Sequence, residues 1–149
     1  MKIVVDTNLI FSAVLNTQSS IGDLLINGEN VFQYYSCQYL RLELDSLRPK
    51  LKELSGLNDR QLDESIFQIL SNISFIDEAL IPYNLWHSVL PLVRDVDMDD
   101  IAFVALNEYL DAKLWTGDKK LYNGLKAKGY NNVINVQEMV VFRNELEKN

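Results

Sequence analysis

Acidic side chains follow two of the apolar segments in this chain of 149 residues. Asp6 comes directly after the apolar run at residues 3–5, and Asp118 follows the segment 112–116 within the sequence WTGDKKL. Consecutive rather than alternating apolar residues are typical of a strand that is buried on both faces. Because ligands bind at the carboxyl ends of strands in open α/β sheets, we expect both carboxylates to lie at one edge of a parallel sheet.

A denser group of acids precedes an apolar helical pattern. The segment RDVDMDD holds four aspartates within six positions: Asp95, Asp97, Asp99 and Asp100. An aspartate at a helix N-cap stabilises the helix by about 0.5–2 kcal/mol, so one or two of them are explained by capping alone. We expect Asp97 or Asp99 to be the cap and Asp100 to point across the helix mouth.

Glu43 is a further acid with two open interpretations. It lies in the segment YLRLELDSL, between Leu42 and Leu44 on a predicted helix. It could be an exposed helix acid paired with Arg41 or Lys50, or it could join the other acids in one site. Its spacing alone does not decide between these interpretations.

Converging carboxylates favour a divalent cation site. Two unit charges about 4 Å apart repel by roughly 4 kcal/mol at an effective dielectric near 20, so such a cluster raises its pKa values or binds a cation. Carboxylate ligands suit Mg²⁺ and Mn²⁺, and such ions can activate water for phosphodiester cleavage. Zinc is disfavoured because His87 and Cys37 are the only His and Cys and lie far apart. A Cys–His nucleophile is disfavoured because a lone Cys is usually a small buried apolar residue.

The remaining pattern alternates strands with helices, which predicts an α/β fold. We expect a three-layer α/β/α sandwich with a mostly parallel sheet of about five strands, in one domain over residues 1–149. Predicted strands are 2–6, 31–36, 74–77, 113–116 and 133–136. Predicted helices are 21–26, 38–47, 58–73, 83–93, 99–110, 119–128 and 137–147, the second interrupted by Pro49.

Composition points to a cytoplasmic protein without a membrane segment. No apolar run reaches the roughly 18 residues that a membrane helix needs, and the N-terminus does not read as a signal peptide. Cys37 has no partner for an internal disulfide. The net charge of −7 argues against a broad basic surface for nucleic acid. The candidate basic residues near the predicted acid site are Arg41, Arg48, Lys50, Lys119 and Lys120.

Three segments together resemble the PIN domain family. They are VVDTNLIFSAVL near the start, YLRLELDSL in the middle and DMDDIAFVALNEYLDAKLWTGDKKL later, in the order and spacing of that family. The resemblance implies an α/β/α sandwich and a Mg²⁺- or Mn²⁺-dependent ribonuclease. Many relatives have that activity, including the VapC toxins of toxin–antitoxin pairs.

The resemblance also assigns roles to particular residues. The four metal-holding, catalytic acids of the family fall on Asp6, Glu43, Asp100 and Asp118. Asp99 competes with Asp100 for the third place, while Asn8 and Thr116 fall on supporting polar positions. One departure is Lys119, which stands where some relatives carry a further acid.

The resemblance implies RNA as the substrate, an antitoxin protein that covers the cleft, and a homodimer. The alternative is a catalytically silent PIN-like binding module whose acids bind metal weakly or engage a partner's Arg. A phospho-acceptor receiver domain fits poorly, because such a domain has paired acids after its first strand and a late strand-end Lys, and this chain has neither.

Overall fold

Five parallel strands form the centre of the molecule, which the computed structural model describes over residues 1–148. They are β1 (Lys2–Val5), β2 (Gln33–Cys37), β3 (Ile73–Ile76), β4 (Lys113–Trp115) and β5 (Val133–Ile134). Their order in the sheet is β3-β2-β1-β4-β5, so β1 lies between β2 and β4. The chain order reverses at β1, because one half of the sheet grows outward from β1 through β2 and the other through β4.

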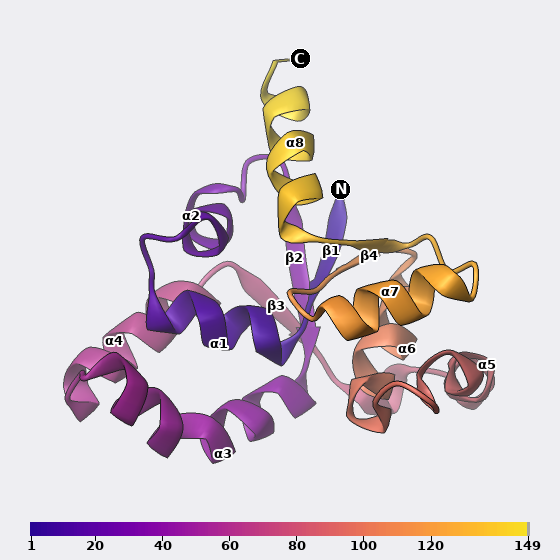
Figure 1. Cartoon of the computed structure of the whole chain (residues 1–149), viewed down its shortest axis with the longest axis horizontal. Helices are drawn as coiled ribbons and strands as arrows, with labels where there is room; N and C mark the ends of the chain where they lie inside the picture. The colour runs from indigo at the N-terminus through magenta and orange to yellow at the C-terminus, as the bar shows by residue number, and fades with distance from the viewer. Residues whose placement is uncertain (149) are drawn as a thin grey trace.

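Eight α-helices surround this sheet within the described residues (Figure 1). On one side lie α1 (Thr7–Leu15), α2 (Ser20–Asn27), α3 (Gln38–Ser55) and α4 (Asp59–Leu70). On the other side lie α5 (Tyr83–Val93), α6 (Ile101–Leu110) and α7 (Lys119–Ala127), and the last helix, α8 (Val136–Glu147), contacts α2. The predicted three-layer α/β/α sandwich is confirmed, and its sheet is entirely parallel.

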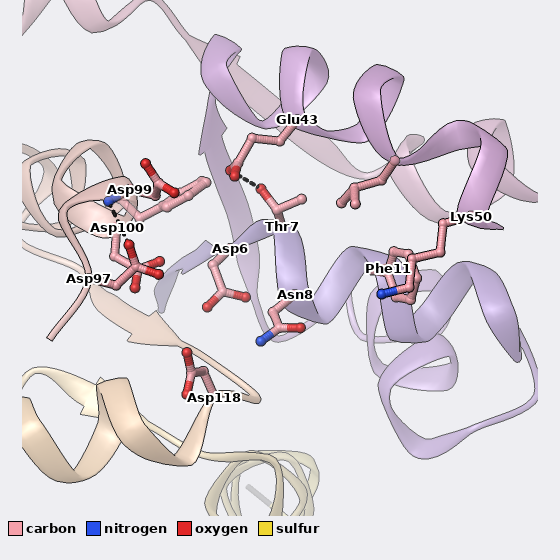
Figure 2. A pocket seen from close by; sticks show the side chains of 12 residues that line it. Asp6, Thr7, Asn8, Phe11, Glu43, Lys50, Asp97, Asp99, Asp100 and Asp118 are labelled. Atoms are coloured by element: carbon pink, nitrogen blue, oxygen red, sulfur yellow. Dashed lines mark hydrogen bonds between the residues drawn. The ribbon is translucent and has the colours of Figure 1, made fainter.

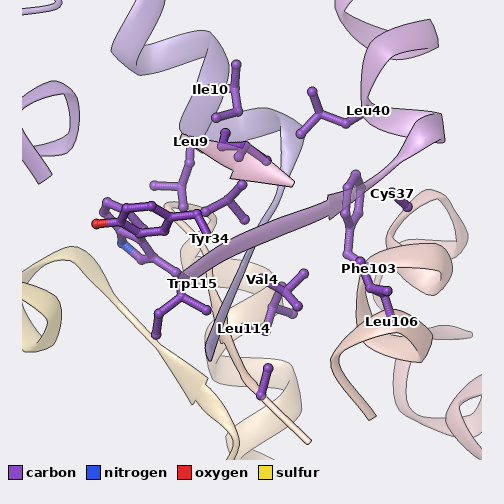
Figure 3. Packing of buried hydrophobic residues seen from close by; sticks show 14 of the residues in the cluster. Val4, Leu9, Ile10, Tyr34, Cys37, Leu40, Phe103, Leu106, Leu114 and Trp115 are labelled. Carbon is purple, nitrogen blue, oxygen red and sulfur yellow. The ribbon is translucent and has the colours of Figure 1, made fainter. Parts of the chain in front are cut away.

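Apolar side chains fill both faces of the sheet, as the unbroken apolar run of β1 predicts. On one face, Val4 and its neighbour Leu114 lie against Leu106 of α6 (Figure 3). On the other face, the rings of Tyr34 and Trp115 lie 6.2 Å apart between their centroids, next to α1. These side chains are at most 2% exposed, so the central strands are fixed at the ends from which the acids project.

One prediction about these helices is wrong, and one helix was not predicted. Pro49 does not interrupt its helix, because α3 continues to Ser55. Proline removes one backbone donor, but Pro49 and Asp45 are exposed, so water can bind the carbonyl that loses its partner. The helix α1 was not among the predicted elements, although Asp6 caps it and its inner face is buried.

Other boundaries shift by a few residues at turns and caps. The predicted helix start at 99 becomes a short 3-10 helix, η2 (Met98–Asp100), followed directly by α6. The last strand, β5, ends early because Asn135 begins α8 with a capping box that includes Glu138. A second 3-10 helix, η1 (Glu78–Leu80), follows β3.

Within residues 1–148, no single helix combines the length and apolar composition needed to cross a membrane; only the pair α1 and α2, bent by 104°, passes that test jointly.

Candidate functional site

Four elements bring acidic side chains to the carboxyl edge of the sheet (Figure 2). Because the strands are parallel, a helix that follows a strand begins at this edge. The helices α1, α3 and α7 follow β1, β2 and β4 in this way. The helix α6 precedes β4 and therefore also begins at this edge. Each of these four helix starts supplies one of the acids of the predicted site.

Asp6 is the most deeply buried of these acids. It ends β1 and caps α1, where its Oδ1 accepts the Leu9 N–H at 3.0 Å. Its side chain is 2% exposed, and burial raises its pKa to about 6. Hydrogen bonds from Thr116 and Leu9 oppose that rise, while the charges of Asp118 and Glu43 add to it. Because burial makes the charged form of Asp6 unfavourable, a nearby cation would stabilise its carboxylate.

Asp118 occupies the equivalent position after β4. It caps α7, and its Oδ1 accepts the Lys120 N–H at 2.9 Å and the Leu121 N–H at 3.3 Å. Its own N–H donates to Thr116 Oγ1 at 3.0 Å. The buried Thr116 hydroxyl thus fixes the turn that carries Asp118 and also bonds Asp6, which links the two strand-end acids.

Glu43 enters the site from the second turn of α3. The Thr7 hydroxyl donates to its Oε1 at 2.6 Å, which ties α3 to the first turn of α1. Burial raises the pKa of Glu43, the Thr7 hydrogen bond lowers it, and the charges of Asp99 and Asp97 raise it. No ion pair to Arg41 or Lys50 forms among residues 1–148, so the interpretation as a paired surface acid is wrong.

Asp100 differs from its neighbours in having an unused carboxylate. Asp97 caps η2, with its Oδ1 accepting the Asp99 N–H at 2.9 Å, which agrees with the prediction that Asp97 or Asp99 is the cap. Asp100 makes no capping hydrogen bond, and its Oδ2 is buried without a partner among the described residues. Burial raises its pKa to about 7, and the charges of Asp6, Asp97, Asp118 and Glu43 add to this. A buried acceptor without a partner is costly and needs an explanation.

These side chains line a pocket of about 250 Å³. The structure brings together all four predicted acids there, with Asn8 and Asp99 at the rim. Thr116 acts on the pKa of Asp6 but does not itself line this pocket. The residues that were not predicted to belong to the site are Thr7, Phe11, Leu47, Asp97 and Phe103. A hydroxyl directly after a strand-end acid was the one signal that could have indicated Thr7.

One of the clustered aspartates and most of the candidate basic residues lie outside the acid pocket. Asp95 is exposed and pairs with Lys128, away from the pocket. Of the five candidate basic residues, Lys50 alone lines the acid pocket within the described chain. Arg48 pairs with Asp63 at 2.7 Å.

The structure also disfavours a thiol nucleophile. Cys37 lies in the core with no exposed surface, and burial raises the pKa of its thiol to about 12. His87 stacks on the exposed Tyr83, with 6.2 Å between ring centroids, on the surface of α5. The thiol therefore stays protonated at neutral pH and lacks a histidine partner.

The chemistry of the acid pocket fits a divalent cation, although its present arrangement is open. Carboxylates with raised pKa values and the unpaired Asp100 Oδ2 are suitable ligands for Mg²⁺ or Mn²⁺. As the side chains stand, no group of three His, Cys, Asp or Glu residues in 1–148 is close enough to hold one ion. Direct binding of one ion by three of these carboxylates therefore requires rotation of some side chains, whereas one or two carboxylates with water can hold Mg²⁺ without it.

Comparisons with known proteins identify the family of this chain. The sequence profile of the PIN domain matches residues 4–138, which include the four predicted metal-holding acids of the pocket. The chain belongs to the PIN domain family. No curated protein sequence matches it.

A solved structure has the same fold. It is a chain of VapBC2 from Rickettsia felis, crystallised with a DNA fragment from its promoter. The two chains superpose with a TM-score of 0.67 at 16% sequence identity, over 91% of this chain and 97% of the other. At this level of identity the comparison establishes a common fold.

Proposed function

We propose that this chain is a Mg²⁺- or Mn²⁺-dependent ribonuclease. The observation that carries the proposal is the convergence of Asp6, Glu43, Asp100 and Asp118 from four elements, with an unpaired buried oxygen on Asp100. These four acids would hold the cation. When bound, such an ion polarises a phosphoryl oxygen and promotes the ionisation of water at neutral pH.

Hydrogen bonds hold one carboxylate oxygen of three of the four acids in position before any ligand binds, and Asp100 is the acid left free to turn. Backbone N–H groups fix Asp6 and Asp118, and the Thr7 hydroxyl fixes Glu43. Such prior positioning reduces the cost of ordering the site when a cation binds. The exposed Asn8 amide lies at the mouth of the pocket, where it can donate to a phosphate oxygen or to water.

The test is cleavage of a mixed panel of structured and single-stranded RNAs, with Mn²⁺ or EDTA. Asn is as good an N-cap as Asp, so the substitution Asp6→Asn should keep α1 intact. We expect it to lower the rate of cleavage by about 100-fold or more. The matched control is Asp95→Asn, which makes the same charge change outside the pocket and should retain the rate. Full activity of a folded Asp6→Asn protein, or cleavage in EDTA, would overturn the proposal.

A protein partner is a second part of the proposal, and it rests on analogy of fold. The similar structure is a VapBC complex, so we propose that this chain is the toxin of a toxin–antitoxin pair. The antitoxin would place a basic side chain among the acids of the pocket and compete with the cation. Co-expression with the product of the neighbouring reading frame should inhibit cleavage, and excess Mn²⁺ should restore it. Unchanged cleavage in the co-expressed pair would contradict this part.

The alternative is a binding module without activity, and the openness of the acid cluster is the observation that favours it. Such a module should bind Mn²⁺ only weakly or not at all and should leave every RNA of the panel intact. Mn²⁺ binding together with cleavage would exclude it.

A further inference from the structure

One end of the acid pocket carries an aromatic ring and a cation instead of carboxylates. On α3, residues 43, 47 and 50 follow helical spacing and all line the pocket, ending with Lys50. On α1, Thr7 and Phe11 are likewise one turn apart and line the opposite wall. Figure 2 shows Phe11 and Lys50 side by side, beyond Glu43 from the other acids. Lys50 Nζ lies 5.7 Å from the centroid of the Phe11 ring.

Lys50 faces the Phe11 ring but has no acidic partner within the described part of the chain. Lys50 takes part in no ion pair there, whereas Lys52 on the same helix pairs with Asp59 at 3.1 Å. An ammonium group without an acidic partner, at the rim of the acid pocket, favours an anionic ligand. Such a ligand would contact Lys50 and extend from there into the pocket. A polynucleotide has this property, since its phosphates repeat along the strand.

The Phe11 ring lines the pocket and is half-buried, so part of the ring is accessible to a ligand. An aromatic face beside a phosphate-binding cation is the arrangement by which proteins bind single strands, because every base can stack on a ring. Bases within a duplex are already stacked and paired, so such a ring selects unpaired nucleotides.

We propose that Phe11 and Lys50 form a subsite for a nucleotide that flanks the scissile phosphate of single-stranded RNA. Lys50 contacts the phosphate of that nucleotide, and Phe11 stacks on its base. This inference rests on the proposed ribonuclease function and adds to it a subsite made of these two residues.

The test is fluorescence anisotropy with a short labelled single-stranded RNA of mixed sequence, in Mg²⁺, using the full chain with Asp6→Asn to prevent cleavage. The variant Lys50→Gln should weaken binding several-fold at low salt and reduce the salt slope by about one. Lys50→Arg should retain both. The variant Phe11→Leu keeps an apolar side chain without a ring and should weaken binding by about fivefold or more.

Two controls on neighbouring surfaces match these changes. Lys52→Gln removes a paired cation from the same helix, and Phe67→Leu removes a ring that is 76% exposed on α4. Both should bind RNA like the parent, and all variants should show the thermal unfolding of the parent.

The cleavage assay separates failure of the subsite from failure of the proposed function. The subsite is wrong if Lys50→Gln binds RNA as tightly as Lys52→Gln, or if Phe11→Leu binds it as tightly as Phe67→Leu. If the natural protein still cleaves RNA, the proposed ribonuclease function stands. Equal affinity for the duplex of the same RNA also overturns the subsite. If the natural protein neither binds nor cleaves RNA, both proposals are wrong. In the active natural chain, the supporting result is a raised KM for Lys50→Gln with kcat little changed.

Discussion

At the scale of single residues, environment separates acids that look alike in the sequence. Asp99 and Asp100 are adjacent and could not be ranked from spacing, because both precede the same apolar helix. The turn of η2 places Asp99 at the exposed rim and turns Asp100 inward, where its Oδ2 has no partner among residues 1–148. The strand-end acids Asp6 and Asp118 were predictable, since the end of a buried strand fixes where the next side chain lies.

This difference predicts unequal effects of two conservative substitutions. Asp100→Asn should lower RNA cleavage by about 100-fold or more, since it removes a charge from the buried centre of the site. Asp99→Asn should lower it by less than about tenfold, because its carboxylate is exposed and screened. Initial rates in saturating Mn²⁺ compare the two. The reverse order would assign the third acid to Asp99.

At the scale of elements, the helix that carries Glu43 is anchored from far along the chain. The N-cap of α3, Cys37, provides no capping side chain. Glu78 of η1 takes that role, with Oε1 accepting the Gln38 N–H at 2.6 Å and Oε2 accepting the Tyr39 N–H at 3.1 Å. No local sequence pattern could reveal this cap, because Glu78 lies 40 residues beyond the helix start.

We therefore expect Glu78→Ala to lower the free energy of unfolding by about 1–2 kcal/mol, since two N–H groups of α3 lose their acceptors. Urea denaturation measures this change. Glu53→Ala is the control, because Glu53 is an exposed acid near the other end of α3. An equal effect of the two substitutions would show that Glu78 does not anchor the helix.

Most strands and helices could be predicted from the sequence, and two helices could not be predicted correctly. The five strands and their mostly parallel direction were predicted from apolar runs that alternate with helical patterns, and all five strands are present. The prediction failed at α1, whose apolar run gives no clear helical stripe because Phe11 and Leu15, outside its buried face, are apolar as well. It also failed at Pro49, where buried Leu44 and Leu51 on either side keep α3 continuous.

At the scale of the whole molecule, a net charge of −7 coexists with acids gathered at one edge of the sheet. Burial raises the pKa of Asp6 to about 6 and that of Asp100 to about 7, from an ordinary value of 3.8. Between about pH 4 and pH 7 the folded chain therefore holds more protons than the unfolded chain. Its stability then falls as pH rises through this window.

In EDTA, we expect the free energy of unfolding to be lower near pH 8 than near pH 5, by about 1–3 kcal/mol after allowing for solvent screening of Asp100. Asp100→Asn should reduce this difference, because it removes one of the two groups and its repulsion of Asp6. The paired acids Asp23, Asp59 and Asp95 have lowered pKa values, so they change the stability only at a pH below this window. Urea denaturation at the two pH values measures the effect, and a stability that rises from pH 5 to pH 8 would contradict it.

The central claim is that the acid pocket binds a divalent cation, and calorimetric titration with Mn²⁺ near neutral pH tests it most directly. We expect the natural chain to bind Mn²⁺, Asp95→Asn to bind it equally well, and Asp6→Asn to bind it at least about tenfold more weakly. No binding by the natural chain up to millimolar Mn²⁺, or equal binding by Asp6→Asn, would contradict the claim.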